Sequence, residues 1–137
     1  MTDVRFGVHP YLLTAIDRVL AAMTAFGCPM RMCQGVRTVD QQHALWRQGR
    51  DLPGHIVTNA DGVTVRSNHQ VHPDGLGHAV DCCFRLGDPF GEHQPWAAYG
   101  ALVEAAGLRW GGRFVLTGGT RDRPHAELSE LSRAISS

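Results

Sequence analysis

The stretch Ala79-Val80-Asp81-Cys82-Cys83-Phe84 is an almost unbroken run of apolar residues with a single acid inside it. Such a run is typical of a strand buried in the middle of a sheet. An acid in a buried strand costs free energy unless it is paired or bound to a cation. The sequence therefore predicts a central strand in which Asp81 has such a partner.

The segments on either side of this strand predict an α+β fold. Apolar residues recur at three- and four-residue spacing over residues 11–26, which predicts a helix. The run Thr38-Val39-Asp40-Gln41 has the capping-box pattern that starts another helix. The other predicted elements are a short strand over residues 30–36, a long loop or irregular β region over residues 51–73, a helix over residues 95–106 and a final strand that carries His125 and Glu127 at an edge of the same sheet. We expect a small, mostly antiparallel sheet with helices packed on one side, in one domain over residues 1–137.

The composition excludes several classes of protein. The 13 Lys and Arg residues are balanced by 13 Asp and Glu residues, so no excess positive charge favours a nucleic-acid partner. No segment approaches the roughly 20 apolar residues that a transmembrane helix needs, and residues 1–10 lack the regions of a signal peptide. We expect a monomer that is made in the cytoplasm and reaches any target outside it only after release by another agent. We also expect buried free thiols, without C-x-x-C spacing, at Cys28, Cys33, Cys82 and Cys83.

Residues of metal-ligand type gather in two short segments. The first runs from Ser67-Asn68-His69 to Gly77-His78-Ala79-Val80-Asp81, and the second is Asp122-Arg123-Pro124-His125-Ala126-Glu127-Leu128. Together they can supply two imidazoles and a carboxylate to one cation, with a further acid beside it. Three protein ligands and a fourth position open to water form the catalytic type of zinc site, which activates water and polarises a carbonyl. The sequence therefore indicates a hydrolase that uses Zn2+.

The order of the polar segments resembles that of a known family. Gln34-Gly35-Val36-Arg37-Thr38, Leu45-Trp46-Arg47-Gln48-Gly49-Arg50 and Val57-Thr58-Asn59-Ala60 precede the S-x-H, G-x-A-V-D, W-G-G and D-x-P-H-x-E-L patterns. In this order the blocks resemble the zinc D-alanyl-D-alanine carboxypeptidase superfamily, with its VanY-like peptidases, and above all its L-alanyl-D-glutamate peptidases, which occur as phage endolysins. The resemblance runs from about Gly35 to Leu128 and implies a hedgehog/D-Ala-D-Ala-peptidase-like fold.

The resemblance implies a set of metal ligands, which are His69, Asp81 and His125 in this chain. The spacing from His69 to Asp81 is longer than the family's usual spacing, which indicates an insertion between Gln70 and Gly75. This insertion leaves His72 open as an alternative first ligand, and His78 as a further one. Only His69 keeps a serine two positions before it, as the S-x-H pattern has.

Other polar residues receive roles beside the metal. The resemblance implies that Asp122 is the general base, which takes a proton from water and passes it to the leaving amine. Glu127 is the alternative base, although we favour it as a partner that orients His125. Arg37 is expected to stabilise the oxyanion or to hold a substrate carboxylate. Gln42 is expected to add a hydrogen bond, and Ser67 to lie near the metal loop.

The resemblance implies a zinc metallopeptidase that cuts an amide bond of the peptidoglycan stem peptide. We expect an L-alanyl-D-glutamate endopeptidase that acts as a bacteriolytic, phage-type endolysin on the cell wall. The alternatives are a D-alanyl-D-alanine carboxypeptidase and a zinc-containing binding module of the same fold without activity. The presence of Asp122 argues against the binding module, because a protein without catalysis does not need a base beside its metal.

Overall fold

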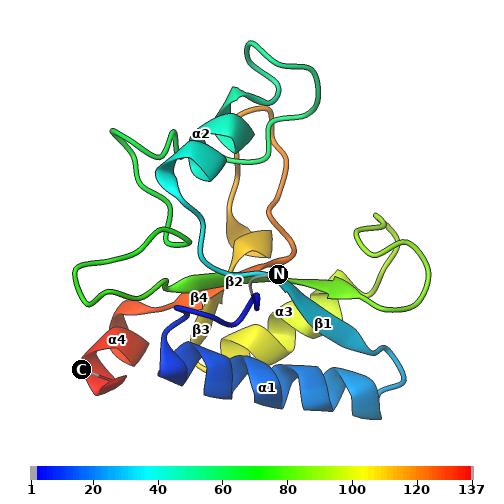
Figure 1. Cartoon of the computed structure of the whole chain (residues 1–137). Coiled ribbons are helices and arrows are strands. Elements are labelled where there is room, and N and C mark those ends of the chain that lie inside the picture. Colours follow the sequence, from blue (N-terminus) through cyan, green and yellow to red (C-terminus); the bar gives the residue numbers. More distant parts are fainter. Residues whose placement is uncertain (1–2, 137) are drawn as a thin grey trace.

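The computed structural model describes residues 3–136, which form a four-stranded sheet with helices on it. The strands lie in the order β1-β2-β4-β3, and each neighbouring pair is antiparallel (Figure 1). The α+β class predicted from the sequence is therefore confirmed. In chain order the elements are α1 (Pro10–Ala25), β1 (Met30–Gln34), α2 (Val39–Arg47), β2 (Ala79–Phe84), α3 (Trp96–Ala105), β3 (Leu108–Trp110), the 3-10 helix η1 (Gly111–Arg113), β4 (His125–Leu128) and α4 (Glu130–Ser136).

The apolar run that contains Asp81 forms β2, an interior strand, as predicted. β2 pairs with β1 on one side and with β4 on the other. Successive strand residues face opposite sides of a sheet, and Val80, Cys82 and Phe84 all belong to the hydrophobic core. Asp81 therefore faces away from this core, and the register places it directly opposite His125 of β4.

β4 does not lie at the edge of the sheet. It lies between β2 and β3, so the expectation that His125 and Glu127 belong to an edge strand was wrong. The edge position is taken by β3, a strand of 3 residues that is too short to show an alternating pattern in the sequence. The extra strand encloses β4, and all its residues are buried.

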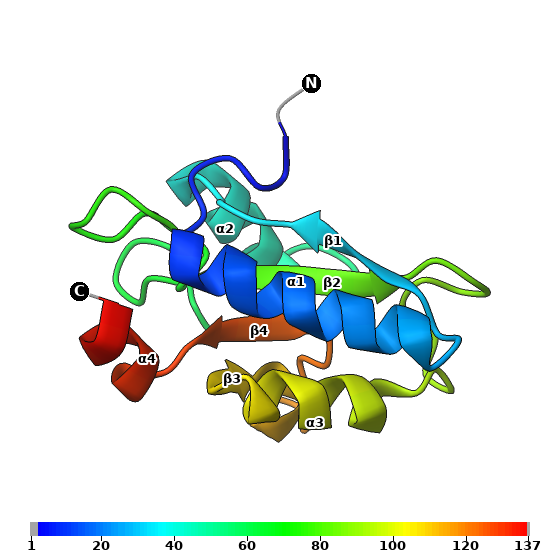
Figure 2. The same cartoon turned by 90° about the horizontal axis from the view of Figure 1, so that it is seen from below.

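The helices α1 and α3 cover one face of the sheet (Figure 2), as predicted. Pro10 begins α1, where its missing N–H costs no hydrogen bond. Both helices bury an apolar stripe against the strands, and each fully buried large side chain contributes roughly 1.5–3 kcal/mol. The buried residues of these stripes include Leu12, Ile16, Val19 and Met23 of α1 and Trp96, Tyr99 and Val103 of α3.

The helix α2 lies on the opposite side of the sheet, among long loops (Figure 1). It starts with the predicted capping box, in which Thr38 Oγ1 accepts from the Gln41 N–H and Gln41 Oε1 accepts from the Thr38 N–H. The irregular segment predicted after it has no helix or strand over residues 51–73. Gln42 of α2 holds this segment, since its Nε2 donates to the carbonyl of Ala60 at 2.9 Å.

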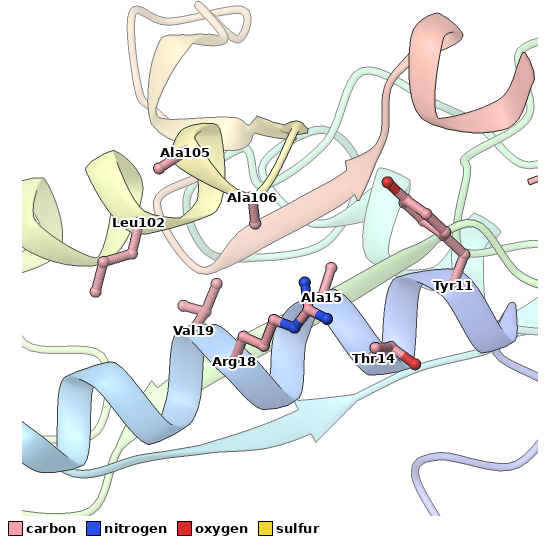
Figure 3. A pocket seen from close by; sticks show the side chains of 8 residues that line it. All are labelled: Tyr11, Thr14, Ala15, Arg18, Val19, Leu102, Ala105 and Ala106. Carbon is pink, nitrogen blue, oxygen red and sulfur yellow. The ribbon is translucent and has the colours of Figure 1, made fainter. Parts of the chain in front are cut away.

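A surface groove of about 340 Å³ runs between α1 and α3 (Figure 3). Its apolar lining includes Ala15 and Val19 of α1, Leu102 of α3 and Ala106, which follows α3 directly. The groove lies on the helical side of the sheet, whereas Asp81 faces the other side. It is therefore separate from the candidate site described below.

Two sequence expectations concern the cysteines and the membrane. All four cysteines are free, but only Cys82 and Cys83 are buried, so the expectation of burial was wrong for Cys28 and Cys33. Both of these lie near surface turns or bulges, where the chain leaves the regular sheet. Among residues 3–136, no helix combines the length and the apolar character that crossing a membrane requires.

Candidate metal centre

Three side chains of metal-ligand type converge on the face of the sheet that carries α2. His69, Asp81 and His125 each point one ligand atom at a common position, with all three atoms within 4.8 Å of one another. Nε2 of His69 lies 3.2 Å from Nδ1 of His125 and 3.3 Å from Oδ1 of Asp81, and the remaining distance, from His125 Nδ1 to Asp81 Oδ1, is 3.6 Å. Ligands about 2.0–2.1 Å from one tetrahedral zinc ion lie about 3.3–3.4 Å apart. The observed separations match this spacing.

The sheet and one loop position these three side chains. Asp81 and His125 are cross-strand partners of β2 and β4. His69 comes from the long loop, which is fixed at this point because the His69 N–H donates to Ser67 Oγ and the His69 carbonyl accepts from the Arg37 N–H at 2.9 Å. Ser67 therefore helps to shape the loop that carries His69.

The outward nitrogen of each imidazole has an acceptor. Nδ1 of His69 donates to the carbonyl of Gly35 at 2.8 Å, and Nε2 of His125 donates to Oε1 of Glu127 at 2.7 Å. A carbonyl or a carboxylate can only accept, so these contacts place a proton on each outward nitrogen. In the neutral rings the inward nitrogens then carry lone pairs, which is the tautomer that binds a metal.

Asp81 shows the strongest sign that the cluster suits a cation. Its Oδ2 accepts from Nη2 of Arg37 at 2.8 Å, while Oδ1, which lies between the two imidazoles, is buried and has no hydrogen-bond partner among residues 3–136. A buried polar atom without a partner costs about 1–3 kcal/mol. A metal ion at this position would remove that cost, and the donor set of two nitrogens and one oxygen suits zinc.

The charges around the cluster affect each pKa differently. Burial lowers the pKa of His69, which keeps this ring neutral. Burial would also lower the pKa of His125, but the nearby carboxylate of Asp81, the hydrogen bond to Glu127 and the charge of Asp122 raise it to about 10. Burial favours the neutral acid in Asp81, yet the two histidines hold the pKa of its carboxyl well below its usual range. Without a metal, one proton on His125 therefore partly balances the surrounding carboxylates.

Asp122 lies beside the cluster, in the turn that leads into β4. Its Oδ2 is 3.5 Å from Nδ1 of His125. Burial is the main cause that raises the pKa of Asp122 to about 6. An acid with this pKa is mostly ionised at neutral pH yet still basic enough to accept a proton from water, as general-base catalysis requires.

The buried Tyr99, the partly buried Trp110 and a glycine hold the turn that contains Asp122. Tyr99 donates its hydroxyl proton to the carbonyl of Pro124, and Nε1 of Trp110 donates to the carbonyl of Arg123, both at 2.8 Å. A Cβ on Gly111 would collide with the carbonyl oxygen of Asp122, so only glycine allows this close approach. The sequence patterns contain Trp110 and Gly111, but the support that they give to the turn was visible only in the structure.

Arg37 and Gln42 form a layer behind Asp81. The two terminal nitrogens of Arg37 donate to Asp81 Oδ2, to Gln34 Oε1 at 2.7 Å and to Gln42 Oε1 at 3.0 Å. Gln42 is fully buried, so its predicted hydrogen bond is made to Arg37 and to the loop. Gln34 completes this layer by accepting from Arg37, although no sequence pattern predicted a role for it.

The alternative ligands His72 and His78 lie outside the cluster. Nε2 of His72 bonds Oδ1 of Asn68 at 3.0 Å, and the His72 ring stacks on that of His78 at 3.7 Å between centroids. His78 bonds Asp74 at 2.7 Å. Among the three histidines considered for the first ligand, the structure brings only His69 to Asp81 and His125.

A cleft of about 710 Å³ opens beside Asp122. Its walls come from residues 55–57 of the long loop, from Phe90, Glu92 and Trp96, and from the segment that precedes β4, including Leu116 and Arg121. The two loops are tied together, because Thr120 Oγ1 donates to the carbonyl of Ile56 at 3.2 Å. The cleft has room for an extended peptide segment next to the candidate base.

The chain is similar in sequence and in fold to peptidoglycan peptidases. Its relatives among known proteins belong to the D-Ala-D-Ala carboxypeptidase and L-Ala-D-Glu peptidase superfamily. The chain is 27% identical over 128 residues to the peptidoglycan L-alanyl-D-glutamate endopeptidase CwlK of Bacillus subtilis (strain 168). The aligned region covers 88% of this chain and 73% of that protein. The sequence matches no family model.

Solved structures show the same relationship. The L-Ala D-Glu endopeptidase ChiX of Serratia marcescens is 25% identical and superimposes with a TM-score of 0.64 over 96% of this chain and 86% of that chain. The vancomycin resistance D,D-pentapeptidase VanY, which was solved with Zn(II), is 16% identical and has a TM-score of 0.61 over 94% of this chain and 78% of that chain. The latter likeness concerns the fold alone.

Proposed function

We propose that the chain is a single-domain, zinc-dependent metallopeptidase that hydrolyses the L-alanyl-D-glutamate bond of the peptidoglycan stem peptide. The observation that carries the proposal is the buried, unpartnered Oδ1 of Asp81 between two inward imidazole nitrogens, with Asp122 beside them. The similarity to CwlK and ChiX supports the choice of bond. The action as an endolysin on the cell wall remains a prediction from the sequence.

The residues of the site would divide the work of hydrolysis. His69, Asp81 and His125 would hold zinc, which when bound polarises the scissile carbonyl and makes water more acidic. Asp122 takes the proton of the attacking water and delivers it to the leaving amine, which contributes roughly 10²- to 10⁴-fold to the rate. Arg37 holds Asp81 in place, and Glu127 holds His125.

The contacts of Arg37 favour an endopeptidase over a D-alanyl-D-alanine carboxypeptidase. A carboxypeptidase has to recognise the free carboxylate at the end of its substrate, and a bidentate arginine is the usual means. Both terminal nitrogens of Arg37 already donate to Asp81, Gln34 and Gln42. Its two-nitrogen fork is therefore engaged inside the protein, which leaves Arg37 poorly placed for this recognition.

Mass spectrometry of fragments released from purified peptidoglycan tests the proposal. The zinc-loaded protein should release peptides that begin with D-glutamate, and a chelator should abolish the release. Asp122→Asn, which keeps the size of the side chain, should bind zinc but lose at least about 100-fold in kcat/KM. Loss of terminal D-alanine alone would identify a carboxypeptidase, and full activity with a chelator would refute the zinc mechanism.

A further inference from the structure

A chain of hydrogen bonds leaves the metal cluster on the side of His125 and ends in the long loop. Nε2 of His125 bonds one carboxylate oxygen of Glu127 at 2.7 Å. The other oxygen of Glu127 accepts from Nδ2 of Asn68, also at 2.7 Å. Oδ1 of Asn68 is in turn 3.0 Å from Nε2 of His72. His72 thus contacts the site through two intermediate side chains.

The direction of each bond follows from its acceptors. A carboxylate only accepts, so the amide nitrogen of Asn68 faces Glu127 and the amide oxygen faces His72. An amide oxygen also only accepts, so Nε2 of His72 carries a proton and donates it. All three contacts can form at once in one arrangement only, which fixes the Asn68 amide and both oxygens of Glu127.

The outer end of the chain is itself rigidly held. The rings of His72 and His78 are parallel within 5° and 3.7 Å apart. His78 is buried and bonded on both sides, because its Nε2 donates to Asp74 at 2.7 Å and its Nδ1 accepts from Nε of Arg133 at 3.0 Å. His78 therefore provides a fixed surface against which the His72 ring is oriented.

We propose that Asn68 and His72 are positioning residues of the metal centre, which hold Glu127 and through it the imidazole of His125. The proposal rests on the proposed function, since it assigns these residues to the zinc site. Groups that orient metal ligands typically change metal affinity or activity 10–100-fold when they are lost. The segment between Gln70 and Gly75, which lengthens the spacing from His69 to Asp81, would then supply a support for the opposite ligand, His125.

Arg109 does not replace this support. It donates to the same oxygen of Glu127, at 3.2 Å, but its side chain is more than half exposed, at 57%. Exposed pairs are screened by water and hold their geometry weakly. Asn68 makes the shorter contact, and its backbone carbonyl is fixed by the N–H of His78 at 2.8 Å. Asn68 is therefore the partner that determines where Glu127 lies.

Zinc affinity, measured by competition with a chromophoric chelator, tests the inference independently of hydrolysis. We expect Asn68→Ala and His72→Leu to weaken binding by about 10–100-fold and about 10-fold respectively, and to change the visible spectrum of the cobalt-substituted protein. His72→Gln should restore affinity, because its amide N–H can replace the Nε2–H donor. His93→Leu, at an exposed histidine, is the control and should bind as the wild type does.

The double variant separates positioning from general loss of stability. If His72 acts through Asn68, the variant with both Asn68→Ala and His72→Leu should bind zinc no more weakly than Asn68→Ala alone. Additive losses, or a His72→Leu protein with wild-type affinity and spectrum, would overturn the inference while leaving the proposed function intact. A wild-type protein that binds no zinc would overturn both. Melting of each metal-free variant verifies that it is folded before binding is measured.

Discussion

Replacing Arg37 with Met should destabilise the metal-free protein far more than the zinc-loaded protein. The ion pair between Arg37 and Asp81 is 2.8 Å long, and its side chains are only 11% and 13% exposed. Removal of one partner from a buried ion pair costs about 3–5 kcal/mol, because the other charge stays buried without compensation. For a chain of this size, that loss corresponds to a fall in Tm of roughly 10–20 °C.

Zinc should cancel part of this loss. A dication at Oδ1 of Asp81 would supply the positive charge that Arg37 no longer provides, so the remaining cost is that of the unpaired oxygens of Gln34 and Gln42, about 1–3 kcal/mol. By thermodynamic linkage, the variant should bind zinc no more weakly than the wild type. Its hydrolytic activity should still fall, because Asp81 loses the contact that orients it.

Thermal unfolding of both proteins, with chelator and with zinc, measures these differences. Arg5→Met is the matched control, because Arg5 pairs with Asp17 at the same 2.8 Å distance but with side chains 40% and 53% exposed. Such an exposed pair is worth less than about 1 kcal/mol, with or without zinc. Equal losses for the two variants in chelator, or a loss for Arg37→Met that zinc does not reduce, would refute the charge-balance reasoning.

Three further predictions concern the ligands and the base. Because the pKa of His125 is about 10 without metal, zinc binding at pH 7.5 should release close to one proton, and the apparent zinc affinity should rise with pH up to about 10. Calorimetry in buffers of different ionisation enthalpy would measure the proton release. Zinc binding without proton release would contradict the prediction. Asp122 must be ionised to accept a proton, and its pKa is about 6, so kcat/KM should fall as the pH drops. The acid limb of the pH profile should lie at or below pH 6, because the positive charge of zinc can only lower the pKa of Asp122. His69→Ala should abolish tight zinc binding, whereas His72→Ala should only weaken it. Equal affinities of the two variants by chelator competition would contradict the ligand assignment, and weaker binding by His72→Ala would reverse it.

The parts of the fold that were predictable have a strong local signal. The run around Asp81 identified β2, and the pair Thr38 and Gln41 identified the start of α2, because burial in a strand and a capping box each leave a pattern within a few residues. β3 left no such pattern, since its 3 residues are defined by pairing with β4. The interior position of β4 depends on that pairing and could not be read locally.

The same limit applies to the candidate site. The types of the proposed ligands and their order were visible in the sequence, and the S-x-H pattern favoured His69, but the long spacing to Asp81 left His72 open as an alternative. The choice between the two histidines depends on the fold of the long loop, where Ser67 and the Arg37 backbone direct His69 towards Asp81. The contact of Gln34 with Arg37 and the proposed role of Asn68 also depend on contacts between separate segments, for which single residues give no signal.

The charges of the centre explain why a dication suits it better than a proton. Asp81 and Glu127 have lowered pKa values, and Asp122 is mostly ionised above its pKa of about 6, so three carboxylates lie close to His125 at neutral pH. Arg37 compensates Asp81 from behind, and without metal the proton on His125 is the other buried positive charge among the described residues of the cluster. Exchange of that proton for zinc adds one net positive charge and gives Oδ1 of Asp81 a partner. The excess of negative charge would therefore favour a bound metal, and it would leave Asp122 beside that metal as an ionised base.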